Sequence, residues 1–256
     1  MIFRKCLFTL IWFTPACYVS AQYAWQKNPE VGKLKPGDSI TYTVEAQGSF
    51  SDGQTPLWLN ANKHGLSSLE RINGYIRGKA QRSIDVDSAR RWAFGYGVDV
   101  AIPFHYSSHV VVQQAYVEGR WLHGTLTIGQ KEHPFQLKNN RLSTGSQTLG
   151  INARPIPELR VALPQYWTIP GTCGWGGLKG HIAYGKLTDS RWERDFTHQQ
   201  SKYTDGVLYH DKAGYLKIQK PSSRFSAELG LEMGALFGGQ SYFPQRDGTV
   251  QTMKNS

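Results

Sequence analysis

Cysteine and long hydrophobic runs are both scarce in this 256-residue sequence. It has three cysteines, and no stretch of 18 or more apolar residues follows the N-terminal segment. The first shortage excludes a small fold held together by several disulfides, and the second excludes a protein that crosses a membrane with helices. Hydrophobic residues make up 39% of the chain and aromatic residues 12%, which excludes a disordered protein.

The first 21 residues have the pattern of a secretory signal peptide. A charged start at Arg4 and Lys5 precedes an apolar middle at 6–19 and a cleavage site of small residues that ends at Ala21. A lipoprotein signal cut before Cys17 is the less favoured alternative, because the residues before it lack the usual leucine. The signal predicts an exported protein.

The chain that remains is basic. Removal of the signal leaves 27 Lys and Arg against 19 Asp and Glu, a net charge of +8, with Cys173 as the single cysteine. An exported protein does not meet genomic nucleic acid, so the charge indicates an acidic polysaccharide, lipopolysaccharide phosphate or simple solubility. One cysteine makes no internal disulfide, so stability must come from packing or β pairing.

Alternation of apolar with other residues is the dominant pattern, and it predicts β-strands. The clearest stretches are 40–46, 92–102, 159–163, 178–184 and 225–237. Twelve steps in the last stretch, at about 3.3 Å each, span roughly 40 Å. Tilted by roughly 40°, such a strand rises by about 30 Å, which is close to the apolar band of an outer-membrane barrel.

We therefore predict an all-β fold, in which residues 22–256 form an antiparallel transmembrane β-barrel of the outer-membrane type with about nine or ten strands. Glycine is frequent on the polar face of these strands, where a packed soluble core has little use for it. The alternative is a secreted β-sandwich or a lipocalin-like barrel with an apolar interior.

The segment 55–73 breaks the strand pattern. Ser67 and Glu70 have the spacing of a capping box, which predicts a short helical turn there. Trp58 and Leu59 are large apolar residues that favour burial over exposure in a surface loop. We expect this segment to plug the barrel or to pack against its mouth.

Six blocks of sequence recur in a recognisable order over most of residues 40–240. They are 55–65, 113–132, 152–170, 179–189, 207–218 and 229–240. Together they resemble the capsule assembly protein Wzi family. The resemblance implies an outer-membrane β-barrel on a Gram-negative cell, with helical elements that plug or flank it, and a non-enzymatic role in holding polysaccharide at the surface. It also implies a partial barrel, because family members are longer and this chain does not end in a strand that closes on an aromatic residue.

The sequence offers no coherent set of catalytic or metal-binding residues, so no enzyme activity, metal or cofactor is expected. His105 and His109 are four residues apart, but Pro103 and the serines between them predict a turn rather than a helix face. Glu228 and Glu232 form a carboxylate pair, which we expect to hydrate the polar interior of a barrel.

Two clusters of aromatic and basic residues are candidate ligand contacts. They are Tyr166, Trp167 and Trp175 in one region, and Arg191, Trp192 and Arg194 after the strand predicted at 179–187. Aromatic rings stack on sugar faces, and Arg or Lys pairs with the carboxylate of a uronate. The alternative for both clusters is the interfacial aromatic belt of a membrane barrel.

The predicted function is that of a monomeric outer-membrane protein that binds capsular polysaccharide or exopolysaccharide and attaches it to the cell surface. Its partners would be that polymer and outer-membrane lipid, and not nucleic acid. A porin-like channel is the first alternative, and a secreted glycan-active β enzyme is the second. Conductance distinguishes the channel from a plugged barrel, and cell fractionation distinguishes the secreted enzyme.

Overall fold

The computed structural model of the protein describes eight stretches of the chain. They are 37–53, 63–88, 90–133, 154–188, 193–194, 197–198, 200–245 and 248–255. The elements whose bounds lie within them are twelve β-strands and one short 3-10 helix, η2 (Ile84–Asp87), and residues 193–194 are also helical; the many strands confirm the all-β class. The described residues contain no helix that is long and apolar enough to cross a membrane. The predicted signal peptide lies outside the described residues.

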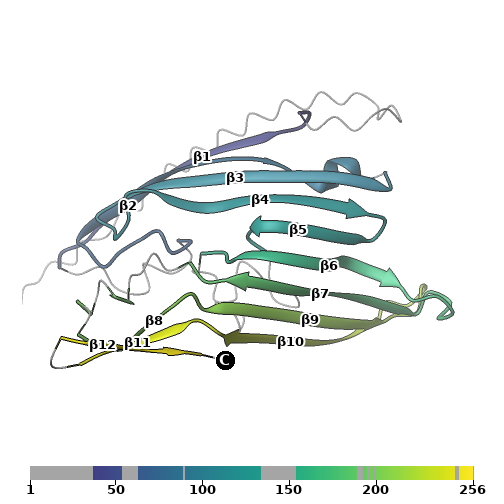
Figure 1. Ribbon diagram of the computed structural model, residues 1–256. Helices are drawn as coiled ribbons and strands as arrows, with labels where there is room; N and C mark the ends of the chain where they lie inside the picture. The colour runs from purple at the N-terminus through teal and green to yellow at the C-terminus, as the bar shows by residue number, and fades with distance from the viewer. Residues whose placement is uncertain are drawn as a thin grey trace, which may run out of the picture.

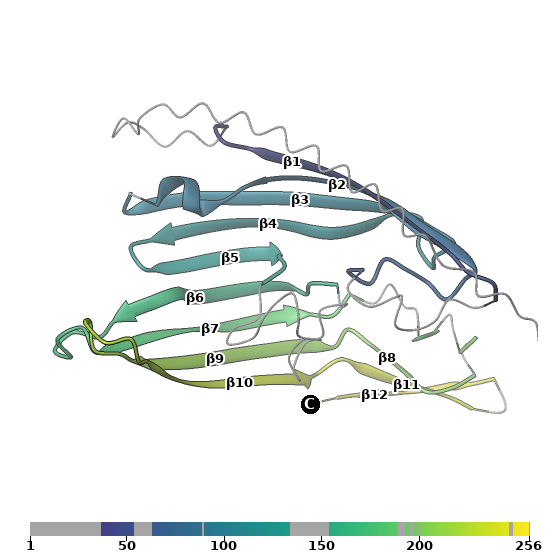
Figure 2. The same cartoon turned by 180° about the vertical axis from the view of Figure 1, so that it is seen from behind.

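Nine of the strands form one large antiparallel sheet in the order β1-β2-β3-β4-β5-β6-β7-β9-β10 (Figure 1). These strands are β1 (Thr41–Phe50), β2 (Ile72–Arg82), β3 (Trp92–Phe104), β4 (Val111–Trp121), β5 (Gly124–Gln130), β6 (Pro157–Thr168), β7 (Gly176–Lys186), β9 (Leu208–Ile218) and β10 (Ala227–Phe237). A second, three-stranded sheet contains β8 (Tyr203–Asp205), β11 (Gln240–Pro244) and β12 (Val250–Lys254). Both views show the nine strands lying side by side (Figures 1 and 2).

The predicted strands are confirmed as parts of β1, β3, β6, β7 and β10. The last one is shorter than expected, because β10 starts at Ala227 and not at Phe225. The backbone N–H of Phe225 donates to the hydroxyl of Ser223 at 3.0 Å, so a local turn takes the place of the first strand residues. Phe225 itself is 87% exposed.

The two faces of the large sheet differ in polarity, and the apolar face is the exposed one. Leu229 and Leu231 of β10 are 74% and 65% exposed, and Ile102 of β3 is 59% exposed. On the opposite face Asp99 has no exposed surface, and Gln114 is 3% exposed. A soluble fold buries its apolar face. In the described strands the apolar residues therefore do not form the enclosed interior that a sandwich or lipocalin-like barrel would have.

The large sheet is open, with β1 and β10 as its two edges. In the described part of the chain no strand pairs with the outer side of either edge. The structure thus contains the predicted antiparallel sheet of long strands, and the described strands of this sheet do not close into a barrel. Because the pairing is antiparallel throughout and nine strands take part, β1 and β10 run in the same direction.

The connections at the two ends of the sheet differ in length. At the end on the right in Figure 1 the links are 83–91, 122–123, 169–175 and 219–226. At the other end they are 51–71, 105–110, 131–156 and 187–207. We call the first of these the short-turn end, and the second, which has three connections of more than 20 residues, the long-loop end.

The helical turn predicted at Ser67 is wrong. Residues 63–71 form turns and bends, and β2 begins directly afterwards at Ile72. The backbone N–H of Glu70 donates to the hydroxyl of Ser68 at 3.3 Å, which closes a local turn in place of a helix cap. Trp58 and Leu59 lie outside the described residues.

Candidate ligand-binding site

The two predicted clusters lie at opposite ends of the large sheet. Tyr166 and Trp167 are near the end of β6, and Trp175 is in the turn before β7, so all three are at the short-turn end. Arg194 follows the other end of β7. Since β7 has 11 residues, its length of roughly 33 Å separates the clusters. They do not form one site.

The second cluster is described only in part, because Arg191 and Trp192 lie outside the described residues. Arg194 is half-buried. Its neighbour Glu193 accepts a hydrogen bond from the backbone N–H of Thr204 in β8 at 3.2 Å, and the Glu193 carbonyl accepts one from the N–H of Thr197 at 3.0 Å. These contacts tie the segment that carries Arg194 to the smaller sheet.

Tyr166 belongs to an aromatic and basic group on the polar face of the large sheet. The Lys179 ammonium lies 4.5 Å from the ring centroid of Tyr166 and 5.0 Å from that of Tyr215. The Lys217 ammonium lies 5.5 Å from the Tyr166 ring. An ammonium within about 6 Å of a ring is attracted to its face. We call these four residues the tyrosine–lysine cluster.

The two glutamates of β10 bind this cluster. The Tyr166 hydroxyl donates to Glu228 at 3.0 Å, and the Lys217 ammonium lies 3.6 Å from the same carboxylate. The Tyr215 hydroxyl donates to Glu232. Both glutamates face the polar side, as predicted. They do more than attract water, because each one holds a tyrosine hydroxyl in place.

The two tryptophans at this end lie apart from the tyrosine–lysine cluster. Trp167 is directly opposite Leu178, so both side chains share the apolar face. Tyr166 precedes Trp167 in β6, and successive residues of a strand point to opposite faces, so Tyr166 lies on the polar face. Trp175 is 48% exposed, and the Lys220 ammonium lies 6.0 Å from its ring. Trp175 is therefore an accessible aromatic surface with a positive charge beside it.

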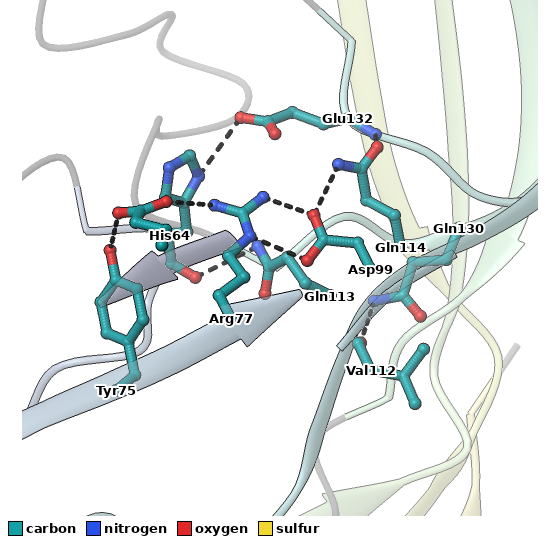
Figure 3. A network of polar contacts seen from close by, with 10 residues as sticks. His64, Tyr75, Arg77, Asp99, Val112, Gln113, Gln114, Gln130 and Glu132 are labelled. Atoms are coloured by element: carbon teal, nitrogen blue, oxygen red, sulfur yellow. Dashed lines mark hydrogen bonds and ion pairs between the residues drawn. The ribbon is translucent and has the colours of Figure 1, made fainter. Parts of the chain in front are cut away.

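A buried network of charges, which the sequence did not reveal, lies on the polar face toward the long-loop end (Figure 3). Arg77 of β2 donates to both carboxylate oxygens of Asp99 of β3, at 2.8 and 2.5 Å. Gln114 of β4 donates to Asp99 at 3.2 Å. Glu45 of β1 lies 3.7 Å from Arg77 and accepts a hydrogen bond from Tyr75 at 2.7 Å. The network joins four strands.

The described end of the β1–β2 connection, residues 63–66, packs on this polar face. Leu66 is 1% exposed and lies in a cluster with Tyr75, Ala101 and Val111. The Tyr106 hydroxyl donates to the Gly65 carbonyl at 2.7 Å, and Gln113 donates to the His64 carbonyl at 3.2 Å. The described part of the segment 55–73 thus packs on the sheet, while the prediction that the whole segment plugs a barrel or packs against its mouth stays a prediction, since residues 55–62 lie outside the described residues. We call residues 63–66 the inner segment.

Charged groups at the loops fix the inner segment further. The Lys63 ammonium donates to Ser49 at 2.7 Å, and burial lowers the pKa of Lys63. His64 Nδ1 lies 3.5 Å from Glu132, which follows β5. The hydrogen bond from His64 is the main reason that the pKa of Glu132 is lowered. The contact between His64 and Glu132 links the β1–β2 connection to the β5–β6 connection.

Acidification should release the inner segment. A carboxyl whose pKa is lowered by folding contributes stability that is fully present above its ordinary value of 4.5 and is lost as the pH falls through the lower, folded value. Protection of residues 63–71 against hydrogen exchange, corrected for intrinsic rates, should therefore be high at neutral pH and fall below pH 4.5. Glu132→Gln should remove this dependence. Equal protection of the wild-type segment across this range would contradict it.

A second row of charges crosses the middle of the polar face. Arg160 of β6 lies 3.2 Å from Glu158 and 3.5 Å from Asp211 of β9. Asp211 also lies 2.7 Å from His181 of β7, and Glu158 lies 3.4 Å from His133. Burial lowers the pKa of His133, which lies in the loop after β5. Arg160 thus lies between two carboxylates, Glu158 and Asp211, and each carboxylate also contacts a histidine ring.

In the stretches that the structure describes, no group of three or more His, Cys, Asp or Glu side chains is arranged to hold a metal ion. The polar face carries paired charges, tyrosine hydroxyls and lysines that suit a hydrated or anionic ligand. Comparison of the chain with protein-family models, with curated proteins and with solved structures finds no match.

Proposed function

We propose that the protein is an outer-membrane β-barrel protein and that the nine strands of the large sheet are part of the barrel wall. The observation that carries this proposal is the exposed apolar face, opposite a polar face on which charged residues such as Arg77, Asp99 and Glu118 are buried. Lipid is the environment in which such an arrangement is stable, because the apolar face then avoids water while the polar face meets a hydrated interior.

Aromatic residues at both ends of the apolar face support the same proposal. Trp92 and Trp121 stack at the short-turn end, with ring centroids 5.8 Å apart, and are 62% and 59% exposed. Phe50 and Phe104 are 70% and 42% exposed at the long-loop end. Membrane barrels carry girdles of aromatic side chains at their two interfaces with water.

The proposed role of the barrel is to retain an anionic capsular polysaccharide or exopolysaccharide at the cell surface. In outer-membrane barrels the short turns face the periplasm and the long loops face outward, so external polymer meets the long-loop end. Arg194 is anchored at that end through Glu193. The net charge of +8 after signal removal and the resemblance to the capsule assembly family favour an acidic polymer.

Arg194→Gln tests this role. Binding of the purified protein to an acidic polysaccharide should weaken by up to about fivefold, because an ion pair at a water-accessible surface contributes about 0.2 to 1 kcal/mol. The matched control is Arg224→Gln, which removes the same charge at the short-turn end and should leave binding unchanged. Cells without the gene should release intact polymer into the medium. Loss of polymer synthesis, or shortened chains produced by the purified protein, would contradict a role in retention.

A porin-like channel is the second candidate, and the tyrosine–lysine cluster is the observation that favours it. The cluster lies on the polar face at the short-turn end, where Lys179 and Lys217 flank the Tyr166 ring. Such an arrangement suits anionic solutes that pass along a hydrated interior. Planar-bilayer conductance distinguishes the two candidates, since a barrel filled by its own segments passes few ions.

A further inference from the structure

Three basic side chains interrupt the apolar face of the large sheet. Directly opposite residues of paired strands share a face, so Lys186, His210 and Lys212 lie on the same side as Tyr184 and Ile182. Arg82 at the end of β2 is opposite Tyr96 and so is also on this side, but it is buried and pairs with Asp87 at 3.0 Å. The same strands present no Asp or Glu there.

The three groups form one patch near the long-loop end. His210 is opposite Tyr184, and their ring centroids are 4.2 Å apart. Lys212 is two residues further along β9, and Lys186 is diagonal to His210 across the strand pair. Neighbours at these positions are roughly 7 to 8 Å apart. We call Lys186, His210 and Lys212 the basic patch.

An open apolar groove of about 450 Å³ adjoins the basic patch. Side chains from five strands line it, namely Ile128, Leu159, Tyr184, Leu208 and Phe237, together with Lys186. Hydrocarbon chains fit such walls, since they present little but apolar surface. Lys186 belongs both to the groove and to the basic patch, so one molecule with an apolar part and an anionic part meets both features.

We propose that the basic patch and the groove bind a phosphorylated, multiply acylated lipid of the outer leaflet. This inference rests on the proposed barrel, because lipid reaches this face only if the strands span the membrane. The phosphate pairs with the lysines, and an acyl chain lies in the groove. Charge on an apolar face is costly unless it is paired, and Lys186 and Lys212 have no acidic partner among the described residues.

The position of the basic patch identifies the leaflet. Long lysine side chains extend along apolar surface and bring the ammonium group toward the headgroup region. The long-loop end faces outward in barrels of this type, so the patch meets the outer leaflet. General interfacial anchoring would distribute basic residues over many strands and both ends. The basic residues of this face that have no acidic partner among the described residues are confined to β7 and β9 at one end, which indicates a specific anionic headgroup.

Lys186→Gln with Lys212→Gln tests the proposal. Full-length protein is inserted into phosphatidylcholine vesicles with or without diphosphoryl lipid A, and lipid that remains bound after detergent extraction is measured by native mass spectrometry. The wild type should retain lipid A, and the double variant should retain about thirtyfold less, since each lysine contributes one attractive charge at the headgroup. Lys202→Gln with Lys254→Gln, two lysines outside the large sheet, is the matched control and should retain as much as the wild type.

Lys186→Arg with Lys212→Arg should restore retention, because arginine keeps the charge and pairs well with phosphate. Equal retention by the wild type and the glutamine double variant would overturn the proposal, and so would a wild type that retains no lipid A. Insertion is followed separately by protease resistance in phosphatidylcholine alone. Insertion without lipid A retention overturns only this inference, whereas failure to insert overturns the proposed barrel and this inference with it.

Discussion

Asp99→Ala should destabilise the protein by about 3 to 5 kcal/mol, the usual effect of removing one partner from a buried ion pair. Asp99 has no exposed surface and accepts three hydrogen bonds, two from Arg77 and one from Gln114. Without the carboxylate, the guanidinium of Arg77 stays buried beside a cavity. The measurement is the free energy of unfolding by guanidinium chloride after refolding into phospholipid.

Glu45→Gln is the matched control for Asp99→Ala. Glu45 is also an acidic partner of Arg77, but its carboxylate is 3.7 Å away and its side chain is 41% exposed. Water screens this pair, so its loss should change the free energy of unfolding by less than about 1 kcal/mol. A small effect of Asp99→Ala, similar to that of Glu45→Gln, would show that the network in Figure 3 does not hold β2, β3 and β4 together.

Leu231→Arg should destabilise the protein by roughly 2 to 4 kcal/mol if the apolar face meets lipid, because a charge near the bilayer midplane is costly. Leu231 is near the middle of β10, opposite Gly214 of β9, and is 65% exposed. In a water-soluble sheet the same arginine would cost little, since it would point into solvent. Heat-modifiable migration and guanidinium unfolding in phospholipid measure the effect.

The neighbouring Glu232→Gln provides the comparison on the opposite face. Glu232 accepts a hydrogen bond from Tyr215, and glutamine keeps a carbonyl oxygen that takes over this role. We expect a change below about 1 kcal/mol. Normal assembly of Leu231→Arg combined with failure of Glu232→Gln would mean that the faces of β10 are reversed.

The sequence predicted the strands and their faces well, because alternation with a period of two follows directly from strand geometry. The stretch 92–102 makes up β3 except for its last two residues, and its even-numbered apolar residues lie on the more exposed face. The predictions that failed concern single turns at the ends of strands. A side-chain turn at Ser223 shortened β10, and Ser68 closed a turn where Ser67 was expected to cap a helix. Such hydrogen bonds compete with regular structure over one or two residues.

The candidate site was less predictable, because it depends on pairing between distant strands. The sequence predicted both Tyr166 and Arg194 as ligand contacts. In the structure the full length of β7 separates them. Tyr166 meets Lys217 and Glu228 only through the order β6-β7-β9-β10, which the sequence does not specify. The alternation in the sequence predicted which charged residues lie on the polar faces of the strands. The partners of Arg77, Lys217 and Asp211 were not predictable, because each of these pairs joins different strands.

In the proposed barrel the apolar face of the large sheet lies against lipid. The most direct test of this placement is a scan of single cysteines along β10, in a background with Cys173→Ser, each labelled with a fluorophore in vesicles that contain lipids with a quencher on the acyl chain. We expect strong quenching at Leu229, Leu231 and Met233, and weak quenching at the intervening positions Gly230 and Glu232. Uniformly weak quenching, or the opposite alternation, would contradict the account.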